Sequence, residues 1–214
     1  MQIDSAILDA SLRAQLPLLE IGIYAPFQPL HEPGARLLLT AHGLMLESCN
    51  GVVHAVTPLG SYDSPIRLPY GKVETGVHVI DEASYRELQA FTKEFVDIAA
   101  RHAPKETLML VVKAPGRPMR SIRASLNETT ASLDYQDWVH MEEGEQILLD
   151  IHSHGSHEAF FSPTDDRDDT RFRGHLKLSC VIGHADTSQP TQAQRWVSRG
   201  HVFCQTQPAR VAFN

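Results

Sequence analysis

The sequence has few cysteines, no long apolar run and no excess of basic residues. Its three cysteines, Cys49, Cys180 and Cys204, are an odd number without metal-type spacing. They therefore indicate neither a disulfide framework nor a cysteine-based zinc site, and they fit thiols in a reducing cytoplasm. No apolar run approaches the roughly 18 residues that cross a bilayer, which excludes a membrane span. The start of the sequence lacks a basic stretch followed by a long apolar region, so a cytoplasmic location is expected.

The charge balance argues against nucleic acid as a partner. The 19 Lys and Arg residues are outnumbered by 26 Asp and Glu, for a formal net charge of −7. Binding to a phosphate backbone needs clustered positive charge, so it is not expected to be the main activity. With 214 residues, 42% of them hydrophobic, the chain can bury a sizeable core.

The first 70 residues differ in composition from the rest. They contain seven of the thirteen prolines and short β-type runs at 36–40, 44–47 and 52–56. Gly43 and the pair Asn50-Gly51 are turn signals between these runs, and Asn-Gly is a strong hairpin signal. This pattern predicts a small β-rich N-terminal unit over residues 1–70, of unknown role, followed by a second domain over 71–214.

The second domain alternates strand and helix patterns. Residues 82–100 carry apolar side chains at close to helical spacing, and this segment breaks at Pro104. Strands are expected at 77–80, 107–112, 146–151, 176–182 and 201–205, with a further helix after residue 162. Helices interleaved with strands of mixed direction predict an α/β or α+β fold around a curved sheet.

Two histidines separated by one residue, His152 and His154, are the most informative feature of the chain. They follow the apolar run 146–151, and residues two apart on a strand point to the same side of a sheet. Asp165, arriving from the following helix, can complete a three-ligand metal site. Such a site leaves one position open, where zinc lowers the pKa of a water to about 7 and so suits hydrolysis.

Other readings of these residues stay open. Ser162, Pro163 and Asp165 also form a good helix start, with an N-cap, a proline in the first turn and an acid three residues after the cap. Asp150 shares a strand face with His152 and is the second choice for the third ligand, because ligands along one strand are spread too far to surround one ion. His157 is expected at the rim of the site.

The spacing His-x-His-x7-Ser-x-x-Asp resembles the motif of the JAMM metalloproteases, also called JAB or MPN+ domains. The resemblance implies one Zn²⁺ per chain held by His152, His154 and Asp165, with Ser162 stabilising the transition state. It also implies a cytidine-deaminase-like mixed curved sheet flanked by helices. It covers residues 77–211, and the N-terminal unit is then a small β-rich extension.

The resemblance also implies an upstream glutamate as the general base. Glu106 is favoured because it stands at a helix-to-strand junction beside the expected metal strand. Glu74, followed by Thr75 and Gly76, is the alternative base, with a local sequence nearer the family signature, but it precedes the helix. The segments 125–127 and 134–135 resemble the family's approach to the histidine pair.

Within the family, the segment 150–169 looks most like the JAB-domain protein A group of bacterial PRTRC cassettes. That resemblance implies a deubiquitinase-like isopeptidase or peptidase acting after the tail of a ubiquitin-like protein. It also implies a ThiF-like activating enzyme from the same cassette as a further partner. The acidic run 165–169 is expected to be mainly a solvated helix face, although an acidic rim could attract a basic tail.

Three alternative functions remain open at this point. One is a JAMM hydrolase of sulfur-carrier proteins or small amides, which shares the chemistry. Another is a catalytically silent MPN scaffold that only binds partners. The third is a zinc nucleoside deaminase, for which the expected Pro-Cys-x-x-Cys ligands are missing from the sequence.

Overall fold

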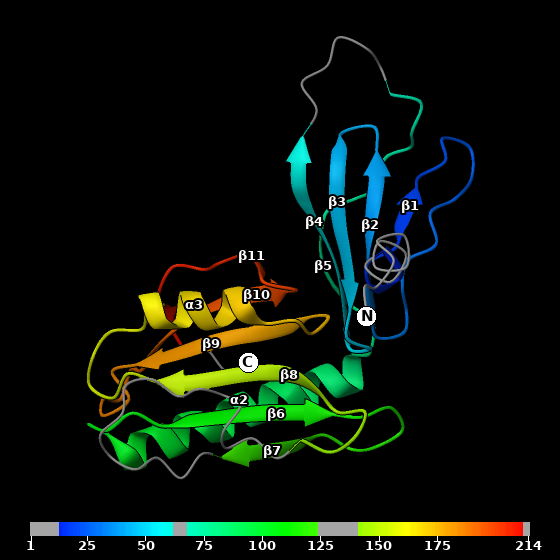
Figure 1. The fold of residues 1–214 in the computed structure, drawn as a ribbon. Coiled ribbons are helices and arrows are strands. Elements are labelled where there is room, and N and C mark those ends of the chain that lie inside the picture. Colours follow the sequence, from blue (N-terminus) through cyan, green and yellow to red (C-terminus); the bar gives the residue numbers. More distant parts are fainter. Residues whose placement is uncertain (1–12, 62–67, 124–140, 212–214) are drawn as a thin grey trace, which may run out of the picture. The chain divides into compact units, whose positions relative to one another are not determined.

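The computed structural model describes residues 13–61, 68–123 and 141–211. The chain divides into two compact units, Met1–Glu82 and Ala83–Asn214. Each unit has its own sheet (Figure 1).

The first unit is β-rich, as the sequence predicted. Within its described residues the sheet has five strands in the order β1-β2-β3-β4-β5. Asn50 and Gly51 form the turn between β3 and β4: the Asn50 side-chain oxygen accepts hydrogen bonds from the amides of Val52 and Val53, at 3.0 and 2.8 Å. Gly51 has φ +80°, which favours glycine. The strands are β1 (Leu18–Glu20), β2 (Gly34–Thr40), β3 (Gly43–Cys49), β4 (Val53–Ser61) and β5 (Gly76–Val79).

The division between the units comes later than the expected boundary near residue 70. The sequence predicts a strand at 77–80 within the second domain, but β5 pairs antiparallel with β4, so that Val53 lies opposite Val79. Its backbone hydrogen bonds therefore belong to the first sheet. The compact units accordingly separate at Glu82 and Ala83, at the start of the next helix.

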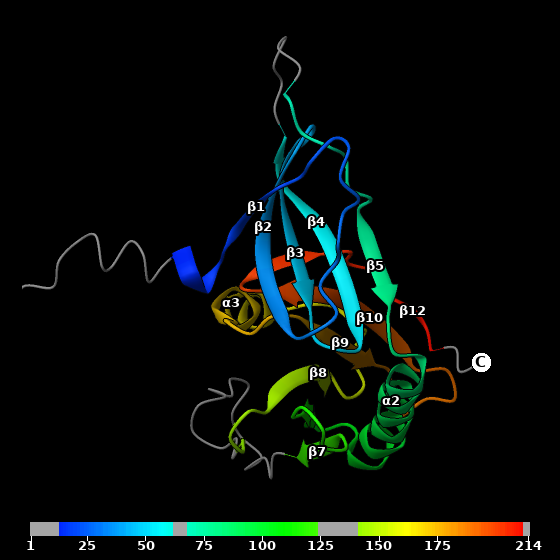
Figure 2. The same ribbon diagram turned by 90° about the vertical axis from the view of Figure 1, so that its right-hand side faces the viewer.

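The second unit is a mixed sheet between two helices, which confirms the predicted α+β class. Its described residues contain seven strands in the order β11-β10-β9-β8-β6-β7, with β12 paired to β10. The pair β8–β9 is parallel and the other pairs are antiparallel. Helices α2 and α3 lie on opposite faces (Figures 1 and 2). The elements are α2 (Glu82–His102), β6 (Leu108–Lys113), β7 (Arg120–Arg123), β8 (Gln146–Ser153), α3 (Pro163–Arg171), β9 (Lys177–Gly183), β10 (Thr191–Ser198), β11 (His201–Phe203) and β12 (Ala209–Arg210).

Helix α2 is amphipathic and extends two residues beyond the predicted range. Leu88, Phe95 and Ile98 are buried on its inner side, and their spacings of seven and three residues align side chains on one helix face. An acidic residue in the first turn and basic residues in the last turn complement the helix dipole. Within the described part of the chain, no helix combines the length and apolar character needed to span a bilayer.

Strand β10 was not among the strands expected from the sequence. Its residues Ala193, Arg195 and Val197 alternate with Gln192, Gln194 and Trp196, so a charged residue stands in the middle of one buried face. Both Arg195 and Trp196 are buried in the structure. Arginine is usually exposed, so Arg195 in the sequence does not indicate a buried strand face. The strand was not predicted for this reason.

The packing of α2 predicts a large effect of one substitution. Phe95 is 0% exposed, so Phe95→Ala leaves a cavity and should lower the free energy of unfolding by about 3–5 kcal/mol. Gln89→Ala, at an exposed position of the same helix, should change it by no more than about 0.5 kcal/mol. Urea denaturation of both variants measures the difference, and equal losses would contradict the packing described.

Candidate metal centre

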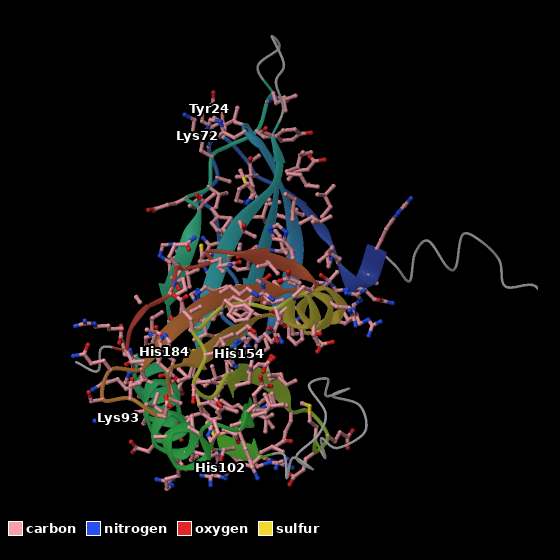
Figure 3. All side chains as sticks on the ribbon, turned by 90° about the vertical axis from the view of Figure 1, so that its left-hand side faces the viewer. Tyr24, Lys72, Lys93, His102, His154 and His184 are labelled. Carbon is pink, nitrogen blue, oxygen red and sulfur yellow. The ribbon has the colours of Figure 1, made fainter. Side chains whose placement is uncertain are left out.

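The two histidines lie at the C-terminal end of strand β8. His152 lies opposite Leu108 of β6 and Val181 of β9, so it is flanked by strands on both sides. His154 follows the end of β8, and its amide donates to the Ile182 carbonyl of β9 at 2.8 Å. In Figure 3 the labelled His154 and His184 come from the ends of these neighbouring strands. The backbone around both imidazole rings is therefore fixed by ladder hydrogen bonds.

Helix α3 presents Asp165 through its N-terminal cap. The Ser162 side chain accepts from the Asp165 amide at 3.3 Å, and the Ser162 amide donates to Asp165 Oδ2 at 2.6 Å. This is the capping box expected from the sequence, with Pro163 in the first turn. The second hydrogen bond occupies one carboxylate oxygen and turns the other, Oδ1, toward His152. Helix capping and ligand presentation are thus combined in the same two residues.

Three potential ligand atoms converge at this point. His152 Nε2 lies 3.2 Å from His154 Nε2 and 3.3 Å from Asp165 Oδ1. All three atoms lie within 4.8 Å of one another, and this is the group of potential metal ligands found among the described residues. Ligands about 2.0–2.1 Å from a tetrahedral zinc are about 3.4 Å apart. The donor set and its spacing therefore fit zinc.

Without a metal ion, the electrostatics of the cluster favour the metal-binding forms of Asp165 and His154, whereas the hydrogen bond to Asp165 favours protonated His152. Burial acts to raise the pKa of the Asp165 carboxyl, but the hydrogen bond and charge of His152 hold that pKa well below its usual range. Burial acts to lower the pKa of His152, and the hydrogen bond to Asp165 raises it above its ordinary value. Burial, and then the charge of His152, lower the pKa of His154. Carboxylate and neutral imidazole are the ligand forms of these side chains.

A second layer of contacts orients His154. Its ring packs edge-on against Phe160 with 4.5 Å between ring centroids. The backbone of Glu158 also hydrogen-bonds the imidazole. A hydrogen bond at one ring nitrogen fixes the tautomer and leaves the other nitrogen free for a metal ion.

The two alternative ligands lie outside the cluster. Asp150 shares the strand face of His152, but its carboxylate is 2.7 Å from Lys177 Nζ in a buried ion pair. His157 is exposed, and its backbone joins the turn after the metal strand, where its amide donates to the His154 carbonyl at 3.0 Å. Asp165 is therefore the carboxylate that meets the histidine pair.

Glu106 lies beside the metal strand in the same unit. The Ser153 amide donates a 2.9 Å hydrogen bond to the Thr107 carbonyl. Thr107 is next to Glu106 in the sequence, and Ser153 is next to His154. Alternation along the strands places Glu106 on the sheet face of the histidines. Burial is the largest influence on the pKa of His152 and His154 and lowers both values, whereas the charge of Glu106 acts to raise both. Glu106 is therefore within electrostatic reach of the two imidazoles.

The alternative base and the two segments upstream of the histidine pair are the remaining sequence candidates. Glu74 is exposed and precedes β5 in the first unit. The segments 125–127 and 134–135, which resemble the family's approach to the histidine pair, lie outside the described residues.

Comparison with known families agrees with the geometry. A model of the prokaryotic homologs of the JAB domain matches residues 88–199, just over half of the chain. The chain belongs to this JAB family. The matched range contains Glu106, Ser162 and the ligand cluster, whereas Glu74 lies outside it. A domain of unknown function (DUF2016) matches residues 6–79. No curated protein and no solved structure matched the chain.

The buried charged groups beneath α3 of the JAB domain were not expected from the sequence. The acidic run 165–169 was expected to be mainly solvated, but Asp169 is 2% exposed and pairs with Lys177 and Arg195. The available signal was a basic residue within each of two apolar strand segments, Leu176-Lys177-Leu178 and Arg195-Trp196-Val197. A buried cation requires a buried anion, and the acidic helix supplies it.

Gly155 sets the separation between the loop that follows His154 and the loop that precedes Glu106 in the JAB domain. It has φ +58°, and a Cβ at this position would lie 2.0 Å from the Pro104 carbonyl oxygen. Pro104 stands two residues before Glu106. Only glycine therefore allows this close approach of the two backbones.

This contact predicts a difference between two glycine substitutions. Gly155→Ala combines a left-handed backbone with a steric clash and should cost about 1–3 kcal/mol of unfolding free energy. Gly116→Ala is the matched control, because Gly116 has φ +72° and nothing within 4 Å of an added Cβ. Denaturant titration should show the larger loss for Gly155→Ala; an equal loss would mean that the two loops are not in contact.

Proposed function

We propose that the JAB domain is a zinc-dependent hydrolase that cleaves peptide or isopeptide bonds after the C-terminal tail of a ubiquitin-like protein. The observation that supports this most directly is the convergence of three potential ligand atoms: His152 Nε2 lies 3.2 Å from His154 Nε2 and 3.3 Å from Asp165 Oδ1. Membership of the JAB family supports the same chemistry.

Each side chain has a role that its position allows. His152, His154 and Asp165 would hold the ion, and zinc bound there would supply an acidified water and a Lewis acid for the scissile carbonyl. Glu106 takes the proton of the attacking water and passes it to the leaving amine. Ser162 accepts from the Asp165 amide through its oxygen. Its hydroxyl hydrogen is then the donor for the oxyanion that develops on the carbonyl.

The proposed substrate follows from the sequence resemblance to the PRTRC group. A ubiquitin-like protein or its conjugates would be the substrate, and a ThiF-like activating enzyme would act in the same cassette. Glycine-type tails offer few side-chain contacts, so an extended tail is expected to bind by adding a strand to a sheet edge. In the described residues of the second sheet, β7 and β11 stand at the ends of the strand order.

Zinc content separates an active hydrolase from a silent MPN scaffold. Wild-type protein purified without chelators should contain about one zinc per chain by atomic emission, because three ligand atoms meet at one point. His152→Ala should reduce this to well below half. His157→Ala, which removes an exposed imidazole outside the cluster, should retain it. Wild-type protein without zinc would favour the scaffold.

Cleavage of tail fusions tests the base and the substrate together. Glu106→Gln should lower kcat by about 10²–10⁴-fold, the usual contribution of a general base, while zinc content stays unchanged. Glu74→Gln is the matched control and should leave kcat unchanged. Loss of turnover in Glu74→Gln but not in Glu106→Gln would transfer the base to Glu74. Cleavage of small amides without cleavage of any tail fusion would favour the small-substrate hydrolase.

A further inference from the structure

Helix α3 lacks the apolar face that usually docks a helix on a sheet. Its sequence, Pro-Thr-Asp-Asp-Arg-Asp-Asp-Thr-Arg, has no aliphatic or aromatic side chain other than Pro163. Among its nine residues, all of which the structure describes, Asp169 alone is buried. A helix of this composition needs another means of attachment. Its position matters because Asp165 belongs to its first turn.

The attachment is a buried carboxylate held by two cations. Asp169 Oδ1 lies 2.8 Å from Lys177 Nζ of β9, and Asp169 Oδ2 lies 2.7 Å from Arg195 Nε of β10. The side chains of all three residues are 2–3% exposed. The helix is thus joined to two neighbouring strands through the two oxygens of one carboxylate.

The same cations reach the elements that carry the proposed ligands. Lys177 Nζ also pairs with Asp150 Oδ2 at 2.7 Å, and Asp150 stands two residues before His152 on β8. Arg195 Nη1 pairs at 2.6 Å with Asp166, the residue next to Asp165. Burial acts to lower the pKa of Lys177, but Asp150 and Asp169 raise it, so the ammonium remains charged.

Two aromatic rings cover this network at the ends of α3. The Phe161 ring lies over the Arg195 guanidinium at 3.8 Å, and the Phe172 ring lies over Lys177 Nζ at 5.0 Å. Phe161 also packs on the cluster of Ala159, Val181 and Ala193. Rings over the cations exclude water, which strengthens charge interactions beneath them.

We propose that Lys177 and Arg195, acting through Asp169, are positioning residues that fix Asp165 against the histidine pair and so set the affinity of the site for zinc. This inference rests on the proposed metal centre. Buried ion networks add little to stability compared with apolar packing of the same volume, but they require a defined geometry. Here that geometry relates α3 to β8, β9 and β10. Partners outside the ligand shell commonly change metal affinity 10–100-fold.

The test is Asp169→Asn, which keeps the size of the side chain and removes the charge that both cations share. Zinc affinity is measured by competition with a chromophoric chelator, and ligand geometry by the visible absorption of Co²⁺-loaded protein. We expect a 10–100-fold weaker zinc affinity and an altered Co²⁺ spectrum in folded protein. Asp97→Asn, the same change at an exposed position of α2, should match wild type in both measurements.

A second variant covers the case in which Asp169→Asn does not fold. Arg195→Lys keeps the charge but loses the fork that reaches both Asp166 and Asp169, so it should weaken zinc binding in the same direction. Wild-type affinity and spectrum in a folded variant, even one with a lowered melting temperature, would overturn the positioning role. Failure of wild-type protein to bind zinc would instead overturn the proposed metal centre itself.

Discussion

The convergence of one carboxylate and two imidazoles from different secondary-structure elements is the constraint on which this structure depends. Strand periodicity places His152 and His154 on one face, and the capping box turns one oxygen of Asp165 toward them. Neither arrangement suffices alone, because the strand and the helix must also be held at a fixed relative position. The parallel pairing of β8 with β9 and the ion network under α3 provide that relation.

The two faces of the second sheet are stabilised by different physics. On one face α2 buries large apolar side chains such as Leu88 and Phe95, and hydrophobic burial tolerates small shifts in packing. On the other face Asp150, Lys177, Asp169 and Arg195 form directional contacts of 2.7–2.8 Å. The directional contacts lie on the face that carries the candidate ligands. Precise geometry is thus concentrated where the proposed chemistry needs it.

Much of this arrangement could be predicted from the sequence because it depends on local rules. The Asn50-Gly51 turn, the amphipathic helix before Pro104 and the cap at Ser162 each follow from a few neighbouring residues. The convergence of His152, His154 and Asp165 could be predicted because their spacing is short in sequence. Strand β10 and the assignment of β5 to the first sheet could not, since both depend on pairing between distant residues. The burial of Asp169 was hidden for the same reason: its partners are contributed by two other strands.

The most direct test of the account is a crystal structure of the full chain grown with Zn²⁺, with anomalous data collected at the zinc edge. We expect one strong peak in each molecule, about 2.0–2.1 Å from His152 Nε2, His154 Nε2 and Asp165 Oδ1. Three side chains pointing apart with no peak between them, or a peak held by other residues, would contradict it.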